Sequence, residues 1–198
     1  MFKRRKGYLL LTMLVLTGLA GRIHSDTLSG KERRHLITEL KTSRAKFLET
    51  IQGLSKKQLQ YRSNKHQLSI EECVRRAAIF ENALWSASVI ALQQSPHRAH
   101  ETEDSLLQAR FYQYMNDCSP YLHPASNKNF QEAVTLYNDE RNEALRYART
   151  TTENVHSHFI QTAWGKPDIY QVILMMSYSS SYYTRQIESI KSSASFPH

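Results

Sequence analysis

Apolar residues recur at spacings of three and four along most of the chain, and the alternation typical of strands is nearly absent. This pattern predicts an all-α protein with four long helices. The expected helices run from about Lys31 to Gly53, from Ser69 to about Gln93, from near Ser126 through Arg149, and from Pro167 in a first turn to about Ser192. A short helical turn at 54–59 and a shorter helix around 105–114 lie between them.

The second helix has a readable start, because the Ser69 hydroxyl can cap the amide of Glu72 while the Glu72 side chain reaches back. On the third helix, Arg141 and Glu143 are expected to face solvent. A polar break at 94–103 separates the second helix from the rest. Four long helices with one polar crossover predict a four-helix bundle.

The first 21 residues predict an N-terminal signal segment. A basic start precedes an apolar run from Tyr8 to Leu19 and a small-residue cleavage candidate at 18–20. The run is about 12 residues, short of the ~20 that span a bilayer, so cleavage is favoured over an uncleaved membrane anchor. The expected organisation is a signal peptide at 1–21 and one domain at 22–198, exported to the periplasm or secreted.

The net charge of the chain narrows the classes of binding partner. The signal segment holds four basic residues and no acidic ones, so the net charge of +8 for the whole chain falls to +4 without it. No basic stripe with interleaved aromatics is visible, which argues against nucleic acid as a partner.

The two cysteines allow two interpretations. Either Cys73 and Cys118 form a disulfide in an oxidising compartment, or Cys73 is a buried small residue and Cys118 a free thiol.

Two segments carry a family resemblance. The segment 68–81 begins Leu-Ser with acidic residues following, and the segment 179–191 contains Arg-Gln-Ile. Both resemble signature segments of the DinB/YfiT-like family, whose first signature runs from Trp-Ser to a His-Leu pair and whose second reads His-x-x-Arg-His-x-x-Gln-Ile. In this alignment Arg76, Ser179 and Tyr183 stand where the family keeps its three histidines.

The resemblance implies a DinB-like bundle whose metal site is degenerate. Family members with intact histidines look like metal-dependent enzymes, among them thiol-dependent transferases. Arginine is cationic and offers no lone pair, and the hydroxyls of Ser179 and Tyr183 are weak, protonated ligands at neutral pH. We therefore expect no metal and no other cofactor at these positions.

The favoured function is non-catalytic, as a binding or scaffold protein. Arg76 could hold a carboxylate or phosphate of a small anionic ligand in a fork, with hydroxyl hydrogen bonds from Tyr183 and Ser179. The competing interpretation is that Arg76 pairs with Glu72 or Glu81 and fills the old cavity.

Two further functions stay open. One is a metal-dependent transferase or hydrolase of the same family, which uses non-standard ligands or employs Arg76 and Tyr183 as electrostatic and acid groups. The other is a bundle that forms a homodimer through an outer helix face.

Other chemistry is weakly supported. His97 and His100 lie beside Glu101, Glu103 and Asp104, but in a polar stretch that is typical of solvated loop. His156 and His158 match no ligand position of the family. Cys73 has no histidine partner at a readable spacing, and the sequence holds no phosphate loop or nucleophile elbow.

Overall fold

The computed structural model describes residues 27–65, 67–97, 104–118 and 129–197, so the predicted signal segment lies outside the described residues. The described elements are α2 (Gly30–Ile51), α3 (Lys56–Gln60), α4 (Ile70–Leu92), α5 (Asp104–Cys118), α6 (Phe130–Thr150), the 3-10 turn η1 (Val155–Ser157) and α7 (Ile169–Lys191). The prediction of an all-helical bundle is confirmed. No helix among the described residues is long and apolar enough to cross a membrane.

Reciprocal capping boxes begin five of these helices. In each, a polar side chain accepts a hydrogen bond from the amide three residues on, and that residue's Glu or Gln side chain bonds back to the cap amide. The pairs are Ser29/Glu32, Ser55/Gln58, Ser69/Glu72, Asn129/Glu132 and Asp168/Gln171.

Two predicted starts are therefore wrong by a few residues. The third long helix begins at Phe130 rather than near Ser126, because Asn129 is its extended N-cap. The fourth begins at Ile169, so Pro167 precedes the helix and Asp168 caps it.

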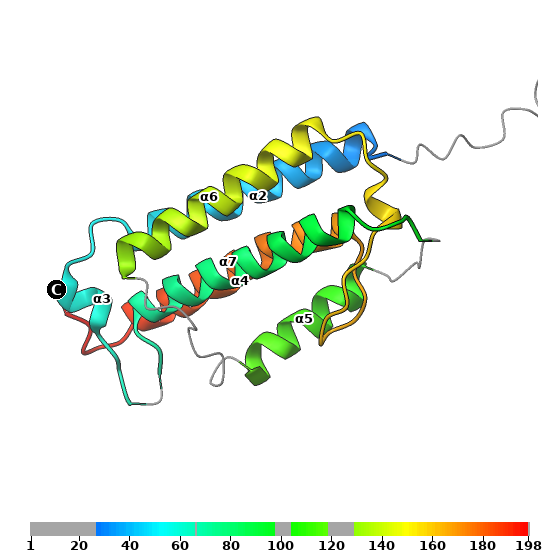
Figure 1. The fold of residues 1–198 in the computed structure, drawn as a ribbon. Coiled ribbons are helices and arrows are strands. Elements are labelled where there is room, and N and C mark those ends of the chain that lie inside the picture. The colour runs from blue at the N-terminus through cyan, green and yellow to red at the C-terminus, as the bar shows by residue number, and fades with distance from the viewer. Residues whose placement is uncertain (1–26, 66, 98–103, 119–128, 198) are drawn as a thin grey trace, which may run out of the picture.

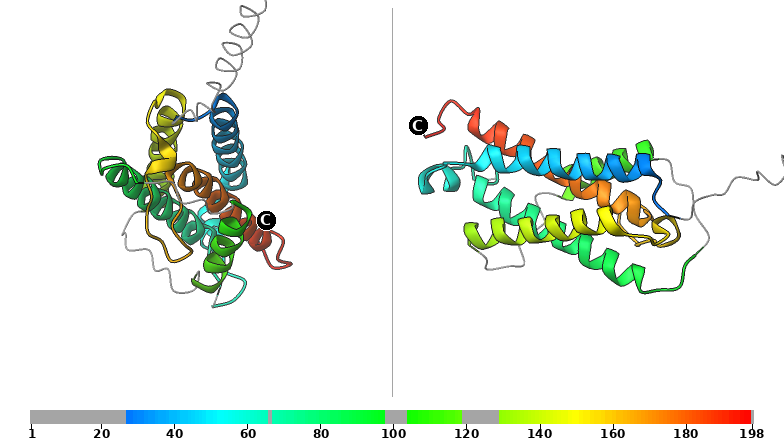
Figure 2. Two further views of the ribbon diagram at one scale, coloured as in Figure 1. Left: turned by 90° about the vertical axis from the view of Figure 1, so that its right-hand side faces the viewer. Right: turned by 90° about the horizontal axis from the view of Figure 1, so that it is seen from above.

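The four long helices form a bundle in which α2 and α6 lie side by side, as do α4 and α7 (Figures 1 and 2). Around the bundle, α2 packs on α7, α7 on α4 and α4 on α6, while α2 and α6 make the slightest of these four contacts. The shorter α5 packs outside the bundle against α7.

Aromatic side chains attach α5 to the bundle. Trp164 lies in the loop before α7. Its ring centroid is 5.4 Å from that of Phe111 and 4.9 Å from that of Tyr114, both on α5, and 5.8 Å from that of Phe80 on α4. Its indole Nε1 donates to Met175 Sδ on α7 at 3.0 Å. This cluster covers the bundle on the side of α4 and α7.

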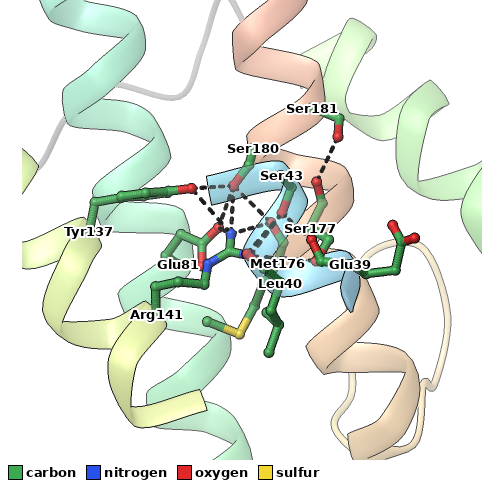
Figure 3. A network of polar contacts seen from close by, with 10 residues as sticks. All are labelled: Glu39, Leu40, Ser43, Glu81, Tyr137, Arg141, Met176, Ser177, Ser180 and Ser181. Atoms are coloured by element: carbon green, nitrogen blue, oxygen red, sulfur yellow. Dashed lines mark hydrogen bonds and ion pairs between the residues drawn. The ribbon is translucent and has the colours of Figure 1, made fainter. Parts of the chain in front are cut away.

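The centre of the bundle contains an ion pair between Arg141 on α6 and Glu81 on α4, and both side chains are 0% exposed (Figure 3). The prediction that Arg141 faces solvent is wrong. Arg141 falls on the inward stripe of α6, between Tyr137 and the buried pair Ala144 and Leu145, and Glu81 falls on the inward stripe of α4.

Arg141 bonds to all three other long helices. Its Nη1 lies 3.1 Å from Ser43 Oγ on α2, and its Nη2 donates to Met176 O at 2.9 Å and to Ser180 Oγ at 2.5 Å on α7. Ser180 Oγ in turn donates to Glu81 Oε1 at 3.0 Å. Burial raises the pKa of Glu81 to about 7, although the Arg141 guanidinium and the Ser180 hydroxyl act in the opposite direction.

Removing one member of this pair should destabilise the fold more than removing both. In Arg141→Met the Glu81 carboxyl loses its cation inside the core, and the free energy of unfolding should fall by about 3–5 kcal/mol. In the double variant Glu81→Leu/Arg141→Met no uncompensated charge remains, and most of the loss should be recovered. Urea unfolding followed by circular dichroism measures both, and a single variant as stable as the double one would contradict this account.

Candidate functional site

The three residues that align with the family's histidines are all buried, on two helices, α4 and α7, that pack on each other. Arg76 on α4 is 7% exposed, and Ser179 and Tyr183, one turn apart on α7, are both 0% exposed. The positive charge of Arg76 acts to lower the pKa of the Tyr183 hydroxyl and that of the Cys73 thiol. Cys73 lies one turn before Arg76 on α4. The structure thus brings together residues that are about a hundred positions apart in the sequence.

Each of the three has at least one buried polar atom that no described residue satisfies. The buried atoms without a hydrogen-bond partner include Arg76 Nε and Nη1, Ser179 Oγ and Tyr183 Oη. Buried polar groups in folded proteins nearly always have a partner, so unpaired ones indicate a bound water, ion or ligand. These four atoms are among ten buried side-chain atoms without a partner in the described part of the chain; Arg141 Nε and Glu81 Oε2 are among the other six.

Arg76 does not pair with either of the acidic residues that the sequence offered. Glu72 instead forms an ion pair with Arg62 and caps α4 through the Ser69 amide at 2.7 Å. Glu81 is bound to Arg141. The interpretation in which Arg76 fills the old cavity through an ion pair is therefore wrong, and its charge is not balanced by a carboxylate among the described residues.

Burial sets the protonation of the groups around Arg76. It raises the pKa of the Cys73 thiol to about 12, so Cys73 is a free, buried, protonated thiol, not half of a disulfide and not a nucleophile. Burial also raises the pKa of Tyr183, with a further contribution from Cys73, and the nearby Arg76 charge only partly opposes it. At neutral pH Tyr183 therefore carries its proton and donates a hydrogen bond.

This donor set does not fit a divalent metal. A guanidinium offers no lone pair and repels a cation, and Tyr183, with its raised pKa, resists the deprotonation that ligation requires. Within the described ranges, no group of three or more His, Cys, Asp or Glu residues is placed to hold a metal ion.

The other histidines have different environments. His97 is exposed at the end of the segment 67–97, and His100, Glu101 and Glu103 lie outside the described residues, so the loop cluster around them stays a prediction. His158 is buried, with Nδ1 3.0 Å from Ala91 O. Its role is structural, since it ties the loop before α7 to the end of α4.

His156 links two helix N-termini, a feature that sequence reasoning missed. Its Nδ1 lies 2.8 Å from Asp168 Oδ2, the cap of α7, and its Nε2 lies 3.4 Å from Glu32 Oε1, in the capping box of α2. The hydrogen bond to Asp168 raises the pKa of His156 most; burial acts against it, while the charges of Asp168, Glu32 and Asp104 add to the rise. The sequence held only a weak signal for this link: His156 lies 12 residues before the cap residue Asp168, while Glu32 lies in a distant helix.

The Trp164-Gly165 turn, also part of the resemblance, borders a groove of about 550 Å³ next to α5. Gly165 has φ +139, a conformation that side-chain-bearing residues rarely adopt, and a Cβ there would lie 3.3 Å from Leu107 Cδ1. The groove contains Arg110 and Asp117 but none of the three residues around Arg76, so it is separate from the candidate site.

Comparison with known proteins supports the fold. No protein-family model matches the chain, and no curated protein matches it. Among solved structures, YfiT from Bacillus subtilis aligns with 83% of this chain and 89% of its own, at a TM-score of 0.57 and 10% sequence identity. It is described as "a probable metal-dependent hydrolase with an unusual four-helix bundle topology". The chain therefore has the DinB/YfiT-like bundle fold expected from its two signature segments.

The His156 contacts predict a pH-dependent stability. Because the pKa of His156 is raised above its ordinary 6.5 in the folded state, its stabilising contribution is full below pH 6.5 and is lost as pH rises through the folded pKa. His156→Asn should lower the melting temperature at pH 6 more than at pH 8.5, whereas His35→Asn on the exposed surface of α2 should change neither. Thermal unfolding at both pH values tests this, and an equal decrease at both would contradict it.

Proposed function

We propose that this chain, a four-helix bundle of the YfiT type, is an exported, non-catalytic binding protein that holds a small anionic ligand between α4 and α7. Arg76 is the recognition residue, and Ser179 and Tyr183 are its hydroxyl partners. The observation that carries the proposal is the buried, uncompensated guanidinium of Arg76.

An unpaired buried charge is energetically costly. Moving a cation out of water costs several kcal/mol unless a counter-charge or several hydrogen bonds replace the lost hydration. Arg141, elsewhere in the same core, has a carboxylate partner and a backbone carbonyl acceptor, although its Nε is unpaired. Arg76 has no carboxylate partner among the described residues, and both its Nε and its Nη1 are unpaired. A bound anion would provide the missing counter-charge.

The geometry of the donors favours a carboxylate or a phosphate. Each N–H of a guanidinium can donate a charge-assisted hydrogen bond to an oxygen of such an anion. The unpaired atoms of Arg76, Nε and Nη1, lie on different edges of the guanidinium and can donate to different anion oxygens, and Ser179 and Tyr183 add hydroxyl donors from α7. Since Tyr183 stays protonated at neutral pH, all of these groups donate to the ligand.

Binding rather than catalysis is supported by the surrounding chemistry. The Cys73 thiol is protonated, and the Glu81 carboxylate is bound to Arg141 and Ser180. The described residues around Arg76 thus include no activated nucleophile and no free carboxylate to act as a base. The proposed export rests on the sequence of residues 1–21, with its basic start and short apolar run.

We expect the site around Arg76 to bind no divalent metal. The purified protein should contain no stoichiometric metal, and zinc, nickel or manganese should leave its melting temperature unchanged, because the site offers a cation where a metal would bind. Elemental analysis and thermal shift measure this. Stoichiometric metal with a clear shift would refute the degenerate site and redirect work to thiol-transfer and hydrolysis reactions.

We expect a small anion to stabilise the protein through Arg76. Among acetate, succinate, phosphate and phenyl phosphate, at least one should raise the melting temperature, by about 5–10 °C at a hundredfold excess over Kd. Arg76→Met should abolish that shift. Without ligand, this variant should be at least as stable as the wild type, because it no longer buries an unpaired charge.

The matched control is Arg75→Met. Arg75 is the neighbour of Arg76 but pairs with Glu71 within α4, so this variant should keep the full ligand shift. Tyr183→Phe and Ser179→Ala should weaken binding and leave the fold intact. A ligand shift that survives in Arg76→Met would place the anion elsewhere.

A further inference from the structure

The seam between α2 and α6 is the most open contact of the bundle. The two helices run in opposite directions side by side (Figure 1) but pack mainly on α7 and α4. Two adjoining grooves of about 460 and 550 Å³ follow the seam and share Ala45 and Leu48 on α2. Together they form one channel, which we call the α2–α6 groove and which is open to solvent.

The groove has a basic end. Lys41 and Arg44 line it from α2, and Arg146 and Arg149 line it from α6. No acidic residue lines this end. Arg44 donates to Asn142 Oδ1 at 2.6 Å across the seam and Arg146 pairs with Glu143, whereas no ion pair or hydrogen bond of the Lys41 or Arg149 side chain occurs within the described ranges.

The floor of the groove is apolar, and its other end carries both apolar side chains and polar ones, among them Gln52 and Gln131. Leu48 and Leu145 lie beneath the basic residues, and the channel continues past Ile51, Phe130 and Val134. Glu49 is the one acidic residue that lines this second part. From Lys41 to Ile51 the groove follows α2 for about 15 Å, or roughly three helical turns.

We infer that the α2–α6 groove is a docking site for an acidic amphipathic helix of a partner protein. A helix laid along the seam would place an apolar stripe on Leu48 and Leu145 and acidic residues beside Lys41 and Arg149. The groove is long, shallow and open, which suits a helix rather than a small molecule that needs enclosure.

The charges argue against two other occupants. A second copy of this chain, packed groove to groove, would offer only Glu49 to balance four cations. A flat anionic membrane would meet Lys41 and Arg149 at the rims but would leave the apolar floor uncovered. The large exposed apolar residues of the described surface, Val89, Ile90 and Leu106, lie on α4 and α5 and not at this groove.

A peptide selection on the full chain tests the inference. A displayed library of amphipathic helices of about 16 residues, with a fixed apolar stripe and polar positions randomised among Asp, Glu, Lys, Ser and Gln, should yield acidic binders. The affinity of the enriched peptides is then measured by fluorescence anisotropy. Lys41→Glu/Arg149→Glu should weaken them by at least about tenfold.

Each variant has a matched control. Lys56→Glu/Lys57→Glu on the exposed surface of α3 changes the net charge equally and should leave affinity unchanged. Ala45→Trp, at the position shared by both parts of the groove, should block binding without a change in charge, whereas Ala83→Trp on the exposed face of α4 should not. Arg76→Met should bind the peptides normally, since the groove does not include Arg76.

Three outcomes would overturn the inference: no enriched peptide, enriched peptides without acidic residues, or equal affinity for the groove variants and their controls. Vesicles that contain phosphatidylserine form the last arm of the experiment. If they bind through Lys41 and Arg149 while acidic peptides do not, the face contacts a membrane and the helix-docking inference is wrong.

Discussion

The buried ion pair between Arg141 and Glu81 is the constraint on which the rest of the structure depends. One guanidinium on α6 contacts a carboxylate on α4, a hydroxyl on α2, and a carbonyl and a hydroxyl on α7. A charge at the centre of a core is tolerated only when such partners are in place. Sliding any one of the four helices by a turn would separate them, so the pair fixes the register of the bundle. That register sets which residues of α4 and α7 face each other around Arg76.

The core contains two buried arginines, Arg76 and Arg141, whose surroundings differ. Arg141 is surrounded by acceptors that the fold supplies, and its role ends with the fold. Arg76 is nearly as deeply buried, but two of its nitrogens and two facing hydroxyls lack partners within the described residues. A buried charge without a partner costs stability, and under the proposed function a bound anion would offset that cost. The three positions that align with the family's histidines thus remain polar and buried in this chain.

The bundle is also asymmetric around its axis. On the side of α4 and α7, α5 and the ring cluster around Trp164 cover the helices. On the opposite side, α2 and α6 meet weakly and leave a groove with a basic end and an apolar floor. The groove and the Arg76 site share no residue, so the two proposed sites do not overlap.

Sequence alone determined the class of fold, because helical periodicity and signals such as the Ser69/Glu72 capping box act locally along the chain. It also singled out Arg76, Ser179 and Tyr183, through two short segments whose spacing resembles the DinB/YfiT-like family. The sequence led us to expect Arg141 in solvent, because a charged residue is usually exposed. Its position on the inward stripe of α6 was a signal to the contrary, as was the position of Glu81 on the inward stripe of α4. Only the tertiary structure decided which acidic residue pairs with which arginine, that His156 joins two helix caps, and that the α2–α6 seam stays open. Each of these depends on distances between segments far apart in the chain, which no local pattern encodes.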